Sequence, residues 1–336
     1  MRCLILGNGP AGIAAAKAIR GRDAGAEILV VGDEAAAPYL RPLLTDVISG
    51  ERLPETLVNP QAADLAEQGI AMRLCAKATH LDPRARTVEF SDGTTERYDA
   101  LLIATGGRPA IPHKLRGFKA QVVALDSLGN ALRIRDRATA SGVVAVLGPG
   151  FLAAVTALSL RKAGRSIVWM KPGEPRFGNP EGGKVDAEVL AAARAAGIVV
   201  LDGAGIGEAH AEGDGLRLTP SRGGDPVVVS MVVIATERHP NTAFLRGSGV
   251  ESGIGVLVDD ALRTNLPGIF AAGDCAELYD KTTHESRFNF GWRSAMAQGH
   301  LAGENMAGAG KAYLRTRDDY FWRLFGPPLR ERFGPR

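Results

Sequence analysis

The sequence of 336 residues contains only three cysteines, Cys3, Cys75 and Cys275, and they stand far apart. Neither these cysteines nor the six histidines show the spacing of a metal site, and no Cys-x-x-Cys pair is present. The sequence therefore predicts neither a metal centre nor a redox-active dithiol. Isolated thiols of this kind are typical of a reducing compartment, so we expect a cytoplasmic protein.

The chain also lacks a strong excess of charge. It has 40 Lys and Arg residues against 37 Asp and Glu residues, a formal net charge of +3. No global field therefore favours nucleic acid or a membrane surface as a partner. The longest nearly apolar run, residues 151–160, is about half as long as a membrane-spanning helix. The first six residues lack the long apolar region of a signal peptide, so we do not expect one. We expect a soluble protein without a membrane span.

Glycine, in contrast, is plentiful, and it marks a unit that occurs twice. Each unit has an apolar strand, a glycine-rich turn, a helical stretch and a second apolar strand. The first comprises residues 3–6, 7–12, 13–20 and 28–31, and the second comprises residues 143–147, 148–153, 154–162 and 167–170. Because the length also exceeds what one hydrophobic core normally supports, the duplication predicts two nucleotide-binding-type domains.

The duplication extends beyond these strands. An Asp-Gly turn at residues 91–93 predicts a hairpin of residues 87–90 and 94–98, and residues 216–218 and 227–229 repeat that pattern. Each unit then closes with an apolar strand that ends in Ala-Thr, at residues 101–105 and 232–236. A β-meander is therefore expected in both domains.

The first glycine turn fits the chemistry of a dinucleotide site. Gly7 allows the sharp turn, Gly9 lets a pyrophosphate approach the backbone, and Gly12 lets the helix pack closely on the strand. The N–H groups and partial charge at the helix start then hold the anion. The acid that binds a ribose falls at Asp33 or Glu34, and we favour Glu34.

The second turn keeps Gly148 and Gly150 but has Ala153 at the third position, which still allows close packing. Lys171 stands where an acid would bind the ribose of NAD. Two interpretations remain open. Lys171, or Arg176 beyond it, receives the 2′-phosphate of NADP, or Lys171 is a solvated residue and the turn binds nothing.

Together with residues 38–44, 98–109, 269–274 and 292–305, these motifs resemble the FAD-dependent pyridine nucleotide–disulfide oxidoreductase superfamily, in the branch of the rubredoxin reductases and the flavin portion of nitrite reductases. The resemblance implies two doubly wound α/β domains of Rossmann type with β-meander insertions. It places an FAD-binding domain at residues 1–112 plus 245–308, an NAD(P)-type domain at 113–244 and a C-terminal tail at 309–336.

The resemblance also implies the cofactor contacts. Asp274 would bind the ribityl chain of FAD, Arg41 would lie near its phosphates, and the helix after Asp274 would point its N-terminus at the flavin. No side chain is assigned a catalytic role, because the flavin carries the chemistry. The residues expected to bind FAD are Gly7, Gly9, Pro10, Ala11, Gly12, Asp33, Glu34, Arg41, Pro42, Ala104, Thr105, Gly106, Gly273 and Asp274, and those expected to bind NADPH or NADH are Gly148, Gly150 and Lys171.

The chain departs from the family pattern on the nicotinamide side. Val155 replaces a glutamate of related NADH enzymes, and Glu237 replaces a glycine that makes room for ligand. The redox cysteines of disulfide reductases are absent, so a disulfide substrate is not expected. Cys275, although next to Asp274, is interpreted as a buried core residue, and Asp46 stands loosely where some relatives have a lysine.

We therefore expect an FAD-dependent oxidoreductase that passes electrons from NAD(P)H to a small molecule or to a protein such as a rubredoxin or ferredoxin. A second hypothesis is a flavin subunit of a larger complex that does not itself use NAD(P)H, and a third is a non-redox nucleotide-binding scaffold. Residues 311–336 are rich in aromatic and basic side chains, a composition typical of protein interfaces. That tail either docks a partner or covers the core of the flavin domain.

Overall fold

The structure is a computed structural model that describes residues 1–138, 142–173, 187–236, 238–280, 285–288 and 291–313. Its chain packs into two compact units. The first holds residues 1–40, 58–107 and the described residues from 239 onward. The second holds residues 41–57 and the described residues of 108–238. Each unit is therefore assembled from segments that are not continuous in the sequence.

The first unit is built on a five-stranded sheet of order β19-β7-β1-β2-β3, in which every pair is parallel. Its strands are nearly continuous apolar runs, as expected where both faces of a parallel sheet are covered. Their bounds are β1 (Arg2–Leu6), β2 (Glu27–Val31), β3 (Ile70–Arg73), β7 (Ala100–Ile103) and β19 (Ile269–Ala271). The strands predicted at 3–6 and 28–31 are confirmed, and the strand predicted at 101–105 is confirmed as far as Ile103.

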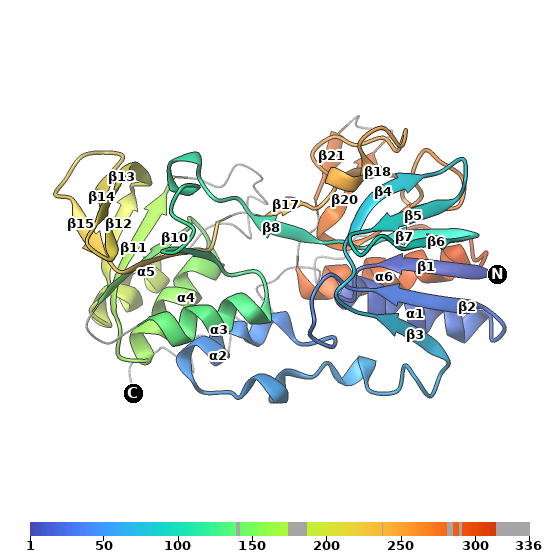
Figure 1. The fold of residues 1–336 in the computed structure, drawn as a ribbon, viewed down its shortest axis with the longest axis horizontal. Helices are drawn as coiled ribbons and strands as arrows, with labels where there is room; N and C mark the ends of the chain where they lie inside the picture. Colours follow the sequence, from blue (N-terminus) through green and yellow to red (C-terminus); the bar gives the residue numbers. More distant parts are fainter. Residues whose placement is uncertain (139–141, 174–186, 237, 281–284, 289–290, 314–336) are drawn as a thin grey trace. The chain divides into compact units, whose positions relative to one another are not determined.

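One face of this sheet is covered by two helices in close contact, α1 (Pro10–Arg22) and α6 (Trp292–Met306) (Figure 1). Small residues allow the contact. A Cβ atom built on Gly299 would lie 2.0 Å from the Ala11 carbonyl oxygen, and one built on Gly303 would lie 2.4 Å from the Ala15 carbonyl oxygen. No side chain larger than hydrogen fits at these two positions, so the sequence fixes where α6 crosses α1.

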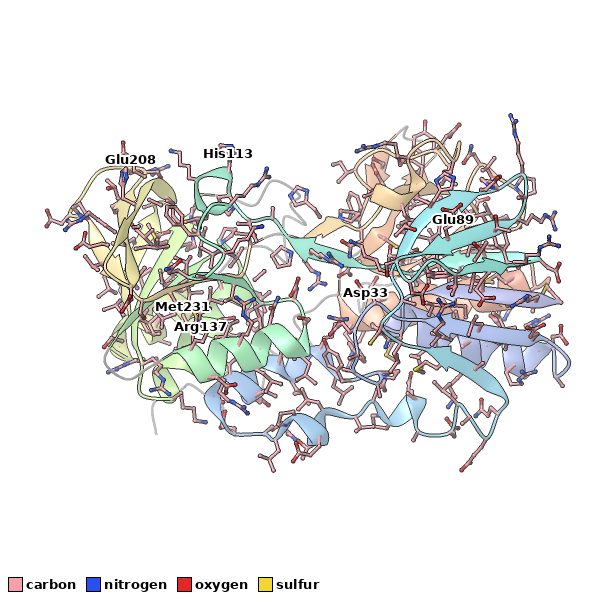
Figure 2. The ribbon with its side chains drawn as sticks, in the orientation of Figure 1. Asp33, Glu89, His113, Arg137, Glu208 and Met231 are labelled. Carbon is pink, nitrogen blue, oxygen red and sulfur yellow. The ribbon has the colours of Figure 1, made fainter. Side chains whose placement is uncertain are left out.

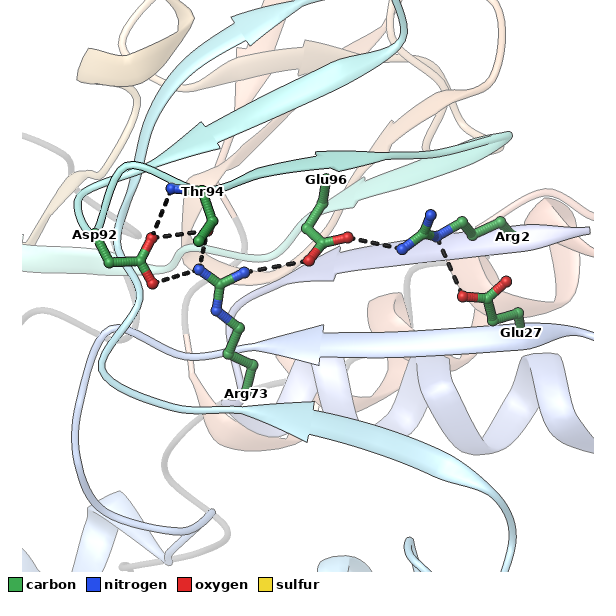
Figure 3. A network of polar contacts seen from close by, with 6 residues as sticks. All are labelled: Arg2, Glu27, Arg73, Asp92, Thr94 and Glu96. Atoms are coloured by element: carbon green, nitrogen blue, oxygen red, sulfur yellow. Dashed lines mark hydrogen bonds and ion pairs between the residues drawn. The ribbon is translucent and has the colours of Figure 1, made fainter.

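The other face carries the meander of β4 (Ala78–Asp82), β5 (Thr87–Phe90) and β6 (Thr95–Arg97), which confirms the predicted hairpin. Leu81, Val88 and Phe90 join the same hydrophobic core as the sheet. Figure 3 shows the polar network that ties the meander to the sheet. Glu96 of β6 accepts from Arg2 of β1 at 2.7 Å and from Arg73 of β3 at 3.2 Å.

A small sheet of β18 (Val256–Val258), β20 (Ala276–Asp280) and β21 (Glu285–Arg287) completes the first unit. Short 3-10 helices punctuate the whole chain. They comprise η1 (Arg41–Leu43), η2 (Pro54–Leu57), η3 (Pro60–Ala62), η4 (His113–Leu115), η5 (Ala243–Leu245) and η6 (Gly273–Cys275).

The second unit repeats the design with a parallel sheet of order β12-β11-β10-β16-β9. Its strands are β9 (Val122–Ala124), β10 (Val143–Leu147), β11 (Ser166–Pro172), β12 (Val199–Gly203) and β16 (Met231–Ile234). Its longer helices are α3 (Leu128–Arg137), α4 (Phe151–Lys162) and α5 (Ala187–Ala195), and its meander is β13 (Ile206–Glu212), β14 (Gly215–Pro220) and β15 (Val227–Val229). The duplication and the second hairpin predicted from the sequence are confirmed.

A segment from the N-terminal part of the chain, residues 41–57, packs with the second unit. Its helix α2 (Leu44–Ser49) contacts α3 and α4, and Lys162 of α4 forms an ion pair with Glu51. The family resemblance instead places this segment in the FAD-binding domain of residues 1–112. Which domain holds which cofactor stays a prediction, because this division reflects packing alone.

Two connections between the units, β8 (Gly107–Pro109) and β17 (Arg238–Pro240), pair with each other as a two-stranded sheet. Among the described helices, none combines the length and the apolar character needed to cross a membrane.

Candidate functional site

Four neighbouring strands of the first sheet, β19, β7, β1 and β2, end at the same edge because they are parallel. Ligands of doubly wound sheets bind at this carboxyl edge. Most of the residues expected to bind FAD follow these four strands directly, and Figure 2 labels Asp33 just beyond β2. They are Gly7, Gly9, Pro10, Ala11, Gly12, Asp33, Glu34, Ala104, Thr105, Gly106, Gly273 and Asp274.

The three glycines of the first turn differ in why glycine, rather than a larger residue, stands there. Gly7 has φ +117°, and a Cβ atom there would lie 2.1 Å from the Ala104 carbonyl oxygen. A Cβ atom on Gly12 would lie 1.9 Å from the Gly7 carbonyl oxygen. Gly9 has φ −77°, which any residue adopts, and a Cβ atom there would meet nothing within 4 Å. Packing therefore requires glycine at 7 and 12, whereas the space above Gly9 is left open.

Gly9 is also the N-cap residue immediately before α1, and the described side chains provide no cap for that helix end. The first N–H groups of a helix need acceptors, and an anion supplies them. The first turn of α1 contains no acidic side chain that would repel such an anion. Open space and uncapped N–H groups thus coincide at one point, and this combination fits the diphosphate of a dinucleotide.

Gly273, the residue before Asp274, lies against this turn. A Cβ atom on Gly273, which has φ +80°, would be 3.2 Å from the Ala11 Cβ atom. The Asp274 carboxylate accepts from the Gly291 N–H at 3.3 Å, immediately before α6 begins. The buried Gln298 of α6 accepts from the Gly273 N–H at 2.8 Å. The fold thus brings the glycine turn and Asp274 together, although they are far apart in the sequence.

Of the two acids after β2, Glu34 is the better placed. Its carboxylate accepts from the Tyr39 hydroxyl at 2.9 Å, and the residue is half-buried, whereas Asp33 is exposed. A side chain that is already oriented by a neighbour loses less conformational freedom on binding a ligand. This geometry favours Glu34 as the acid that binds a ribose, but its role stays a prediction.

Cys275 is fully buried, and its thiol donates to the carbonyl oxygens of Ile103 at 3.3 Å and Ala272 at 3.4 Å. Burial raises the pKa of this thiol above its ordinary value. A neutral, hydrogen-bonded thiol is a poor nucleophile. The interpretation of Cys275 as a core residue is confirmed, and all three cysteines of the chain are free thiols.

Arg41 and Pro42 belong by packing to the second unit, not to the unit that contains the first turn. The Arg41 guanidinium donates to the Asp126 carbonyl oxygen. Asp46 is almost completely buried in α2 and pairs with Arg52 at 3.1 Å. The expected contact of Arg41 with the FAD phosphates stays a prediction.

The second turn reproduces the strand contacts of the first. A Cβ atom on Gly148 would lie 2.1 Å from the Ala235 carbonyl oxygen, as one on Gly7 does from the Ala104 oxygen. Gly150 is the N-cap of α4, and no side chain of the described residues caps it. Val155 is buried within α4. Glu237 and Arg176 lie outside the described residues.

Lys171 is the last residue but one of strand β11, and it pairs with an acid that the sequence analysis did not single out. Its ammonium donates to Asp202 at the end of β12 at 2.9 Å, and its side chain is only 18% exposed. The hydrogen bond from Lys171 lowers the pKa of Asp202 below its ordinary value. Asp202 follows the apolar residues 199–201 of β12, as Asp33 comes shortly after the apolar strand β2, so an acid after an apolar run is the signal that could have identified it. The structure shows Lys171 as one half of an ion pair, not as a solvated lysine.

Among the described residues, no group of three or more His, Cys, Asp or Glu side chains is placed to hold a metal ion. The site at the first turn offers backbone N–H groups, open space above Gly9 and the carboxylates of Glu34 and Asp274. Such a site suits an organic dinucleotide.

Comparison with known proteins agrees with this geometry. Residues 1–299 match the family model described as pyridine nucleotide-disulphide oxidoreductase. The chain is 32% identical over 308 residues to the NADH-dependent phenylglyoxylate dehydrogenase subunit epsilon of Aromatoleum evansii, with 91% of this chain and 72% of that protein covered. It is 28% identical over 317 residues to NADH-rubredoxin oxidoreductase of Clostridium acetobutylicum, with 93% and 76% covered.

The fold is also that of a solved relative. The crystal structure of NADH:rubredoxin oxidoreductase from Clostridium acetobutylicum superposes with a TM-score of 0.75 at 27% identity and covers 94% of this chain and 77% of its own. A family match over most of the chain, the two Rossmann-type sheets and the first turn all agree. This chain therefore belongs to the pyridine nucleotide-disulphide oxidoreductase family, and it is an FAD-dependent oxidoreductase of the rubredoxin reductase branch.

Proposed function

We propose that this protein takes electrons from NADH and passes them through FAD to an electron-carrier protein of the rubredoxin or ferredoxin kind. One observation carries the proposal. Three features lie at one edge of the first sheet: the open space at Gly9, the uncapped start of α1 and the 3-10 helix η6 that holds Asp274. The named activity of the Clostridium acetobutylicum relative supports the choice of acceptor.

The residues assigned to FAD would each bind a different part of the cofactor. Gly9 and the N–H groups at the start of α1 would hold the diphosphate, Glu34 would bind the adenosine ribose, and Asp274 would bind the ribityl chain. FAD accepts two electrons from a nicotinamide and releases them one at a time to an acceptor. The chain's own residues position the flavin, and the start of α6 places a helix N-terminus next to Asp274, where negative charge is favoured.

The ion pair of Lys171 with Asp202 supports NADH over NADPH as the donor. A 2′-phosphate brought to Lys171 would also meet the Asp202 carboxylate, which is bonded to the same ammonium at 2.9 Å. The negative charges of the phosphate and of the Asp202 carboxylate would repel each other. We therefore assign Gly148 and Gly150 to the diphosphate of NADH and treat Lys171 as neutralised.

A disulfide is not the proposed acceptor, because the chain has no pair of thiols to exchange with one. The three cysteines are separate, and both Cys3 and Cys275 are buried. A one-electron carrier protein needs no thiol relay from the flavin. We place the reaction in the cytoplasm, where such thiols stay reduced.

The test is anaerobic mixing of the purified protein with NADH or NADPH while the flavin absorbance is followed. We expect NADH to bleach the flavin rapidly and NADPH to do so slowly, followed by reoxidation on addition of rubredoxin. In the variant Gly9→Val we expect loss of most of the bound FAD. Gly21→Val, at another glycine with open space in α1, should retain it. A purified protein without flavin bands would contradict the proposal and support a non-redox scaffold.

A second function is favoured by the relative from Aromatoleum evansii, which is named as a subunit of an NADH-dependent dehydrogenase. In this alternative the chain is the flavin subunit of a larger complex, and its residues 309–336 dock a partner subunit. A flavin that neither nucleotide bleaches, together with co-purification of a redox partner from the native host, would support it. A lone monomer that NADH reduces would exclude it.

A further inference from the structure

The second glycine turn contains a hydrogen bond that has no counterpart in the first. The indole N–H of Trp169 donates to the Gly148 carbonyl oxygen at 3.0 Å. Trp169 lies in the middle of β11 and is fully buried. In the first sheet the equivalent position in strand register is Val30, which has no side-chain donor. The bond is therefore specific to the turn assigned to the pyridine nucleotide.

The two turns differ in conformation where this bond is made. Gly7 has φ +117°, and its carbonyl oxygen lies where a Cβ atom of Gly12 would be, at 1.9 Å. Ala153 occupies the position equivalent to Gly12 and has a real Cβ atom. The Gly148 carbonyl therefore has no room in the place that the Gly7 carbonyl takes, and φ of Gly148 lies outside the positive range. The carbonyl is directed to Trp169 instead.

Trp169 is also the polar partner that fixes the next peptide. The residue after Gly148 is Pro149, so the peptide between them has a carbonyl oxygen but no N–H. In the first turn the residue equivalent to Pro149 is Asn8. Its side chain donates to the Ala36 carbonyl oxygen at 3.2 Å and anchors the loop. The second turn has no such anchor at Pro149.

From these contacts we infer that Trp169 is a positioning residue for nicotinamide dinucleotide binding, because its indole N–H holds the Gly148 carbonyl and thereby orients the turn that leads to Gly150 and α4. Without the bond, the carbonyl is left buried and unpaired, and it regains a partner only by rotation of the peptide. Glycine permits that rotation at low cost. The nucleotide must then reorder the turn when it binds, which weakens its affinity.

The inference rests on the proposed function, since it assumes that this turn binds the nucleotide. The experiment is titration of the FAD-loaded protein with NAD⁺ by isothermal calorimetry, combined with steady-state kinetics with NADH. For Trp169→Phe we expect the Kd for NAD⁺ and the KM for NADH to rise roughly tenfold, as for loss of one buried hydrogen bond. The kcat and the FAD content should stay unchanged.

Leu218→Ala is the matched control, because Leu218 is a buried residue of the same domain in β14. It should lower the melting temperature without changing the Kd for NAD⁺. To separate shape from hydrogen bonding, Trp169 is also replaced by 3-benzothienylalanine, which keeps the bicyclic shape and removes only the N–H. This variant should reproduce the tenfold loss of affinity.

A Kd within twofold of the wild type in both Trp169 variants would overturn the inference, and so would an equal loss of affinity in Leu218→Ala. Failure of the proposed function has a different signature. In that case the wild type itself binds no NAD⁺ and its flavin is not reduced by NADH, which would overturn both claims.

Discussion

The two glycine turns of this protein have the same strand contacts and different means of holding their loops. In both, the first glycine packs against the Ala-Thr end of a neighbouring strand. A Cβ atom built on either glycine would lie 2.1 Å from the carbonyl oxygen of that alanine. The first turn then uses a positive φ at Gly7, a glycine at 12 and the Asn8 side chain. The second uses Ala153 and the Trp169 indole. A duplicated fold thus preserves its backbone packing while the polar contacts around each ligand position diverge.

Exchange of the third residue between the turns should give the largest difference. Gly12→Ala puts a Cβ atom 1.9 Å from the backbone oxygen of Gly7, which cannot move without opening the turn. We expect a loss of about 3 kcal/mol in the free energy of unfolding and loss of FAD. Ala153→Gly adds no atom and should cost about 1 kcal/mol through helix propensity. Urea denaturation and flavin absorbance measure both, and equal costs would refute the assignment of different packing to the two turns.

Removal of the acid beside Lys171 should change nucleotide preference to a smaller extent. In Asp202→Asn the ammonium of Lys171 no longer faces a carboxylate. We expect the KM for NADPH to fall about fivefold relative to that for NADH, which corresponds to about 1 kcal/mol. Glu212→Gln is the control, since Glu212 pairs with Arg217 in the meander of the same domain. An unchanged ratio of the two KM values would show that Lys171 does not approach the 2′-position.

The smallest effect concerns the polar network of Figure 3, which lies in the first domain. Hydrogen bonds from Thr94 and Arg73 lower the pKa of Asp92 to about 2. Because the folded-state pKa is lower than that of the unfolded chain, ionised Asp92 stabilises the fold above pH 4, and this contribution is lost as the pH falls through 2. An NMR titration of the Asp92 carboxyl group should give the low pKa, and Arg73→Gln should raise it. A midpoint near 4 in the wild type would contradict this expectation.

Much of the fold was predictable because local chemistry determines it. Glycine turns after apolar strands, an Asp-Gly hairpin and the repeated Ala-Thr strand ends each have a physical reason within a few residues. The carboxyl edge of the first sheet followed from those strands, and Gly273 and Asp274 were then located by resemblance. These features are short in range or belong to a repeated pattern.

What could not be predicted depends on contacts that are distant in the sequence. Trp169 has the pattern of an apolar residue in a buried strand, and only the structure shows its N–H bonded to a carbonyl 21 residues earlier. The ion pair of Lys171 with Asp202 joins two strands whose register the sequence does not specify. The packing of residues 41–57 with the second unit depends on a helix of six residues, too short for a periodic pattern.

The insertion of the second unit between β7 and β19 has a consequence for synthesis of the chain. The strand β19 completes the first sheet and the helix α6 packs on α1, yet both leave the ribosome only after the second unit has been made. At ordinary elongation rates this delay is on the order of ten seconds. During that interval the edge of β7 that pairs with β19 and the side of α1 that packs against α6 are exposed to solvent. A chaperone that shields nascent chains is therefore expected to contact residues 1–107 first, and premature termination within the second domain should yield an aggregating fragment.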